Sequence, residues 1–214
     1  LFWHNHFATS NRKVDDLKQM KRQNESLRQF ALAPFGDLLR NMAHDPALLN
    51  WLDAPQNRSG HPNENLAREL MELFTLGIGH YSEHDVKEAA RSLTGWTVRQ
   101  GEFRDLPAVH DDGEKEILGR TGKWSGDDLV NILLEQPATA HRLAWRLTSE
   151  FFGEGVVSPA AMDELAARLH QDNLNIHNSV ETILRSELFF SPANIGTRIA
   201  DPVSFIIGPL RSLE

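Results

Sequence analysis

Apolar residues recur three and four positions apart over most of the chain, which is the spacing of one face of an α-helix. The pattern is clear between residues 27 and 52, where Pro34 and Pro46 stand at positions suited to the first turn of a helix. It returns in five stretches after Ser125, and the last of these begins at Asp201-Pro202 and is interrupted at Gly208-Pro209. We therefore expect a mostly all-α fold, a multi-helix bundle.

Two further helices are predicted in the middle of the chain, over residues 63–77 and from about residue 83 to Trp96. At about 100° per residue, the apolar side of the first helix carries Leu66, Ala67, Leu70, Met71, Leu73 and Phe74. Its polar side carries Glu64, Asn65, Arg68, Glu69, Glu72 and Thr75. Gly77 ends this helix, and we expect the two helices to pack as an antiparallel helical hairpin.

The helical period disappears between residues 97 and 124, which predicts a non-helical insert. Asp112-Gly113 stands between two extended stretches, residues 103–110 and 115–118, and is typical of the turn of a small β-hairpin. The chain is interpreted as a single helical domain over residues 1–214 with this insert. Because Leu1-Phe2-Trp3 falls inside an amphipathic pattern, we expect the domain to be a fragment of a longer chain.

Charge and composition exclude several classes of function. The 30 acidic and 22 basic residues give a net charge of −8, and the basic residues are scattered, which disfavours nucleic-acid binding. The chain has no cysteine, so disulfides, thiolate metal ligands and a cysteine nucleophile are excluded. No apolar run reaches the about 20 residues of a transmembrane segment. Neither the compartment, whether cytoplasmic or exported, nor the oligomeric state can be inferred from these features.

Three stretches resemble a known bacterial family. They are residues 2–10 (FWHNHFATS), residues 63–77 (NENLARELMELFTLG) and residues 81–96, which end in ARSLTGW. The chain is similar there to the domain of unknown function 1800 family. The resemblance extends through HDDGEK at residues 110–115. It implies a bacterial source, a longer full-length protein and a protein partner encoded by a neighbouring gene, but no particular reaction.

Histidines and carboxylates in these stretches are candidate metal ligands. His4 and His6 are two residues apart, so both reach one metal only if the segment is extended or a helix ends there. His110 and Asp111 precede the predicted turn, where they could bind Zn²⁺, Mn²⁺ or Ca²⁺. Each also has a structural explanation: a histidine packs against Trp3 or caps a helix, and Asp-Gly is favoured in turns.

Glu69 is the candidate catalytic residue of the helix at residues 63–77. Glu64, Arg68 and Glu72 are four residues apart and are explained by ion pairs along a solvated face. Glu69 lies toward the apolar side, where a carboxylate could act as a buried ligand or general base, although structural ion pairs also occupy such positions. The five residues His4, His6, Glu69, His110 and Asp111 would form a metal site if the fold brought them together.

Two functions follow from these interpretations. The first is an interaction or scaffold module that binds a protein or an envelope polymer, and it is preferred because no catalytic signature is complete. The alternative is a metal-dependent hydrolase, in which the divalent metal would activate a water molecule beside Glu69. On a later helix, Arg142, Trp145 and Arg146 resemble an interface, but a buried tryptophan with solvated arginines is the preferred explanation.

Overall fold

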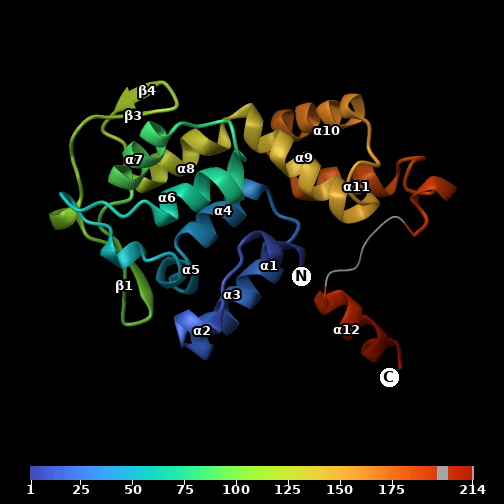
Figure 1. Ribbon diagram of the computed structural model, residues 1–214, viewed down its shortest axis with the longest axis horizontal. Helices are drawn as coiled ribbons and strands as arrows, with labels where there is room; N and C mark the ends of the chain where they lie inside the picture. Colours follow the sequence, from blue (N-terminus) through green and yellow to red (C-terminus); the bar gives the residue numbers. More distant parts are fainter. Residues whose placement is uncertain (197–201, 214) are drawn as a thin grey trace.

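Helices make up most of the protein in this computed structural model, which describes residues 1–196 and 202–213 (Figure 1). The mostly α-helical prediction is confirmed. The α-helices are α1 (Phe2–His6), α2 (Asn11–Val14), α3 (Leu17–Gln29), α4 (Phe35–Ala43), α5 (Pro46–Trp51), α6 (Asn65–Glu69), α7 (Glu83–Ser92), α8 (Gly126–Leu134), α9 (Pro137–Phe152), α10 (Pro159–Gln171), α11 (Ile176–Leu184) and α12 (Pro202–Ser212). Among these residues no helix combines the length and hydrophobicity needed to cross a membrane.

Several helices begin where their sequences predict. Ser125 caps α8 in a capping box, in which its hydroxyl accepts a hydrogen bond from the Asp128 backbone N–H and the Asp128 carboxylate accepts one from the Ser125 N–H. Pro46 occupies the first turn of α5 and Pro159 the first turn of α10. Pro34 differs from its prediction, because it stands one residue before α4, at the N-cap position.

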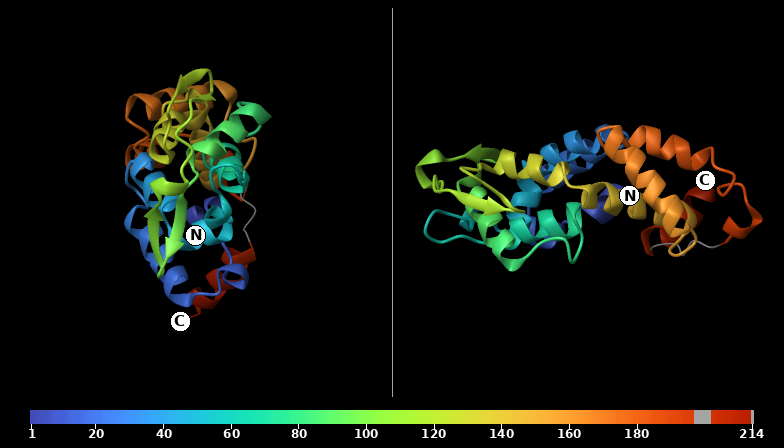
Figure 2. Two further views of the ribbon diagram at one scale, coloured as in Figure 1. Left: turned by 90° about the vertical axis from the view of Figure 1, so that its left-hand side faces the viewer. Right: turned by 90° about the horizontal axis from the view of Figure 1, so that it is seen from above.

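The elements form an elongated body with the β-structure at one end (Figure 1 and Figure 2). Helices α4 to α8 gather near the two β-hairpins, while α9, α10 and α11 pack together at the opposite end. One cluster of buried apolar side chains extends through both groups, from Trp3 and Phe35 to Leu143 and Ile183. The single-domain interpretation is consistent with this core but stays a prediction.

A π-helix, η2 (Leu70–Thr75), follows α6 directly, where an uninterrupted α-helix was predicted. A π-helix bonds residue i to i+5, so each residue turns through less than 100°. Leu73, predicted on the apolar side, is consequently 43% exposed, whereas Thr75, predicted on the polar side, is buried. The buried Thr75 hydroxyl donates a hydrogen bond of 2.6 Å to the Leu70 carbonyl oxygen.

The insert contains two hairpins, and neither uses the predicted turn at Asp112-Gly113. Strands β1 (Trp96–Arg99) and β2 (Glu102–Asp105) pair antiparallel, as do β3 (Lys115–Ile117) and β4 (Arg120–Gly122). Their two-residue turns, Gln100-Gly101 and Leu118-Gly119, have positive φ at both positions, as a type I′ hairpin requires. Trp96, predicted at the end of a helix, begins β1 instead, because α7 ends at Ser92.

Side-chain hydrogen bonds, and not strand pairing, fix the segment around Asp112-Gly113. The buried Lys115 ammonium donates hydrogen bonds to the carbonyl oxygens of Asp111 and Gly113. These carbonyls therefore bind a side chain, while β3 pairs with the strand that follows it. The short 3₁₀-helix η3 (Pro107–Val109) lies between the two hairpins in the sequence. Two others, η1 (Ala54–Gln56) and η4 (Pro192–Asn194), lie in loops.

The last helix, α12, continues through Gly208-Pro209, where an interruption was predicted. Pro209 is the eighth residue of the helix and lacks the N–H that would bond one turn back. The predicted start at Asp201 lies outside the described residues. Figure 1 shows α12 set apart from the packed helices of the body.

Candidate functional site

The five predicted metal ligands are distributed over separate elements. His4 and His6 belong to α1, Glu69 ends α6, and His110 with Asp111 precedes β3. Figure 1 shows α1 near the middle of the body and β3 at its end. Among the described residues, no group of three His, Asp or Glu side chains is arranged to hold a metal ion. The structure does not bring the five side chains together, and metal binding stays a prediction.

His6 is part of the apolar core. Its ring lies 4.7–5.9 Å, centroid to centroid, from those of Trp3, Phe7, Phe35 and Phe74. Its Nε2 donates a hydrogen bond of 3.1 Å to the Phe74 carbonyl oxygen, at the C-terminal end of η2. Burial, with the positive charges of nearby arginines on α9, lowers the pKa of His6 from 6.5 to about 3. The imidazole is therefore neutral at physiological pH.

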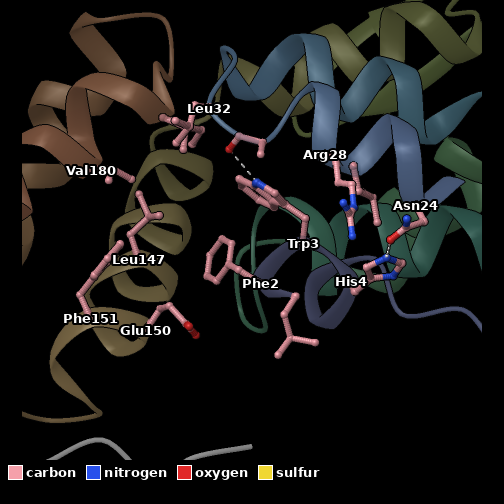
Figure 3. A pocket seen from close by; sticks show the side chains of 14 residues that line it. Phe2, Trp3, His4, Asn24, Arg28, Leu32, Leu147, Glu150, Phe151 and Val180 are labelled. Atoms are coloured by element: carbon pink, nitrogen blue, oxygen red, sulfur yellow. Dashed lines mark hydrogen bonds between the residues drawn. The ribbon is translucent and has the colours of Figure 1, made fainter. Parts of the chain in front are cut away.

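His4 is half-buried at the edge of a cavity of about 370 Å³ (Figure 3). Its Nε2 is 2.9 Å from the Oδ1 of Asn24 on α3. In Figure 3, Phe2 and Trp3 face Leu147 and Phe151 of α9 across the cavity. The walls are thus mainly apolar, and the volume falls within the range of about 300–1,000 Å³ typical of small-molecule sites.

Asp111 and His110 are held by α7 and the turn that follows it. The Arg91 guanidinium contacts both carboxylate oxygens of Asp111, at 2.8 and 3.1 Å, and also binds Glu88. This pairing holds the pKa of Asp111 at about 2. His110 is half-buried, and its Nδ1 donates a hydrogen bond of 2.9 Å to the Thr94 carbonyl oxygen. Asp111 thus already has a full set of protein partners.

Glu69 is half-buried and lies beside like-charged Glu72. Burial raises the pKa of Glu69, and the negative charge of Glu72 raises it further. Glu72 itself accepts a hydrogen bond of 2.5 Å from the Tyr81 hydroxyl, while Arg68 pairs with Glu64 and Glu83. The predicted ion pair between Arg68 and Glu64 is thus present. No hydrogen bond to Glu69 is found in the described part of the chain, so it is the most chemically available of the five candidates.

The arginines of α9 differ from the sequence-based expectation that they are solvated. Arg142 and Arg146 are each half-buried, and the Nε of each is buried without a hydrogen-bond partner. Trp145, expected in the core, is itself only half-buried. The spacing of four residues between the arginines was visible in the sequence, but their burial depends on α1 and η2, which pack on α9 from distant positions.

The apolar face of α12 is a second feature that the sequence analysis did not identify as a site. Its large apolar side chains are exposed to between 42% (Ile207) and 71% (Phe205). Ile206 and Leu210 are four residues apart and therefore share one face of the helix, and Leu213 follows directly after its end. Contiguous apolar surface of this kind is typical of interaction sites.

Comparisons with known proteins identify a family. Comparison with the curated proteins and with the solved structures gave no match. One family model matches residues 1–214, which is the whole chain, and its description is protein of unknown function (DUF1800). This confirms the resemblance found in the sequence and adds no activity to it. The chain belongs to the family of proteins of unknown function called DUF1800.

Proposed function

We propose that this chain is a scaffold module that assembles with a second copy of itself through the apolar face of α12. The observation that carries the proposal is the exposure of that face. On the helix Ile206 is 59% exposed and Leu210 57%, and Leu213, the residue after the helix, is 85% exposed, although all three are residues that usually lie inside proteins. Pairing α12 with its counterpart in a second copy would remove this apolar surface from water, at about 25 cal/mol per Å².

The low charge of α12 makes this helix the surface best suited to contact with a second copy. Two copies that each carry a net charge of −8 repel one another over most of their surfaces. Within α12, however, Arg211 is the single charged residue. This helix is therefore a surface on which two acidic chains can approach without bringing carboxylates together. A closed, twofold contact between identical helices would bury the apolar faces of both helices at once.

Sedimentation velocity of the purified chain, from micromolar to sub-millimolar concentration, tests the proposal. We expect a concentration-dependent monomer–dimer equilibrium. The double substitution Ile206→Asp/Leu210→Asp should raise the dimer dissociation constant at least about a hundredfold, because it replaces two buried apolar side chains with charges. Circular dichroism should show that the variant is still folded, because α12 lies apart from the core.

Matched controls distinguish this contact from non-specific association through exposed apolar side chains. Leu17 is 76% exposed on α3 and Ile78 is 82% exposed after η2, so Leu17→Asp and Ile78→Asp remove comparable apolar surface elsewhere. Both controls should dimerise like the unmodified chain. A monomer at every concentration would overturn the proposal and would favour a different partner, such as the neighbouring gene product that the family resemblance implies.

The metal-dependent hydrolase predicted as an alternative is not proposed as a second function. No observation favours it, because in residues 1–196 and 202–213 the candidate ligands do not group as a metal site. Glu69 has the raised pKa that a general base would use, but no hydrogen bond joins it to a second candidate catalytic group in that part of the chain.

A further inference from the structure

Two neighbouring arginines of α9 lack the carboxylate partners that seven other arginines of this chain have. Ion pairs of 2.5–3.9 Å with Asp or Glu are formed by Arg22, Arg40, Arg68, Arg91, Arg120, Arg168 and Arg185. No such pair involves Arg142 or Arg146 in the part of the chain that is described, although the chain has an excess of acidic residues. Among the described residues, no carboxylate therefore lies within ion-pair distance of either guanidinium, and Glu150 acts on Arg146 only from beyond that distance.

The buried atoms of these side chains are also without partners. The Nε–H groups of Arg142 and Arg146 are buried, and neither guanidinium forms a hydrogen bond within the described residues. A buried donor left unbonded costs about 1–3 kcal/mol, and more when it is charged, so such groups are rare in folded proteins. Two of them one turn apart on the same helix indicate that a ligand supplies the missing acceptors.

Aromatic rings orient both guanidiniums. Arg142 lies over the ring of Trp145, 4.9 Å from its centroid, and Arg146 lies over the ring of Phe2 at 5.5 Å. Stacking occupies the flat faces of a guanidinium, whereas its N–H donors point outward in the plane of the group. The donors of both side chains form no hydrogen bond among the described residues, and the rings limit the orientations that the side chains adopt.

The local electrostatics favour an anion with two charges. Arg142 lowers the pKa of Arg146, because each positive charge disfavours the other, while burial has the larger effect. Glu150 opposes this only in part. Burial, and to a smaller extent both arginines, lowers the pKa of His6, so its imidazole is neutral and adds no positive charge beside them.

We propose that Arg142 and Arg146 together bind a phosphate group, either as inorganic phosphate or as part of a phosphomonoester. A tetrahedral dianion offers enough oxygen atoms for two guanidinium forks and neutralises both charges. A monocarboxylate has two oxygen atoms and one charge, so it would leave one of the arginines uncompensated. The site lies on α9, between α1 and the end of η2, and does not involve α12.

Titration of the ¹⁵N-labelled chain with inorganic phosphate, followed through the arginine Nε–H resonances, tests the site directly. We expect the resonances of Arg142 and Arg146 to shift together and to saturate. The dissociation constant should rise at least about tenfold in Arg142→Gln and in Arg146→Gln, because each removes one charge-assisted contact. Arg185→Gln is the matched control, since Arg185 is 80% exposed and pairs with Glu181. It should bind phosphate like the unmodified chain.

Acetate at the same ionic strength distinguishes the dianion from general anion screening. The proposal is overturned if acetate shifts the two resonances with equal affinity, or if phosphate leaves them unshifted. It is also overturned if Arg185→Gln weakens binding as much as Arg142→Gln. Glycerol phosphate distinguishes the two sources, because tighter binding than that of inorganic phosphate identifies a phosphomonoester as the ligand.

Discussion

His6 illustrates how an aromatic environment changes the chemistry of a candidate ligand. Four aromatic rings surround it, and its Nε2–H is committed to the Phe74 carbonyl oxygen. A metal ligand must be able to offer a nitrogen lone pair to the ion, and such a ligand usually lies where a metal can enter. At 4% exposure, His6 acts as a packing residue that satisfies a carbonyl left free by the π-helix.

The lowered pKa of His6 predicts an acid-sensitive fold. The unfolded histidine binds a proton below about pH 6.5, whereas the folded one resists protonation down to about pH 3. Between these values the unfolded state binds more protons, so the free energy of unfolding falls as the pH decreases, by up to about 1.4 kcal/mol per pH unit. Urea unfolding at pH 7, 6 and 5 measures this slope. In His6→Asn, which can still donate to Phe74, the slope should be smaller, and an unchanged slope would contradict the assignment.

Asp111 is the second residue for which a structural role can be measured. Its bidentate contact with Arg91 is only partly exposed, so Asp111→Asn should lower the free energy of unfolding by about 1–2 kcal/mol. A double-mutant cycle with Arg91→Met isolates the pair and should give a coupling energy of about 1 kcal/mol. The contribution is present above about pH 3.8 and is lost as the pH falls toward 2. Additive effects of the two substitutions would contradict this pairing.

At the scale of elements, hydrophobic periodicity predicted where helices occur but not their hydrogen-bond register. Nothing local distinguishes an i→i+4 from an i→i+5 ladder over Leu70–Thr75, because the choice depends on what each face contacts. The π-helix turns Leu73 outward and Thr75 inward, and only tertiary packing decides between these outcomes. Tertiary packing also decides the role of Asp112-Gly113. This dipeptide has a turn-like composition, but its segment supplies carbonyl oxygens that bind the Lys115 ammonium.

The start of α8 provides a sharp test of packing between elements. Gly126 is the first residue of α8, and a Cβ atom there would lie 2.3 Å from the ring of the buried Trp96. Replacing glycine by alanine in a helix normally stabilises it by about 1 kcal/mol. Gly126→Ala should instead destabilise the protein by about 1–3 kcal/mol, because Trp96 must shift within a close-packed core.

Gly208→Ala is the control for that substitution. Gly208 lies within α12, and a Cβ atom there would meet nothing within 4 Å. Thermal unfolding followed by tryptophan fluorescence should therefore show a lower midpoint for Gly126→Ala and an unchanged or higher one for Gly208→Ala. Equal midpoints for the two variants would contradict the close contact between α8 and β1.

For the whole molecule, the fold class and the family could be predicted from sequence, whereas the candidate site could not. Helical periodicity is local, and the motifs that resemble the family are contiguous. Convergence of His4, Glu69 and His110 would depend on how α1, α6 and the insert pack, which no spacing within the chain determines. The partly buried arginines of α9 and the exposed face of α12 are likewise products of long-range packing.

The contact between two copies through α12 is most directly measured by the distance between their helices. Because the chain has no cysteine, Ser212→Cys provides a single attachment point for a spin label, and Ser212 faces away from Ile206 and Leu210 on the helix. Pulsed electron paramagnetic resonance should give a short, narrow distance distribution, consistent with helix axes about 8–10 Å apart. The distribution should disappear in Ile206→Asp/Leu210→Asp. A dimer without short distances between labels, or labels that remain uncoupled at every concentration, would contradict assembly through α12.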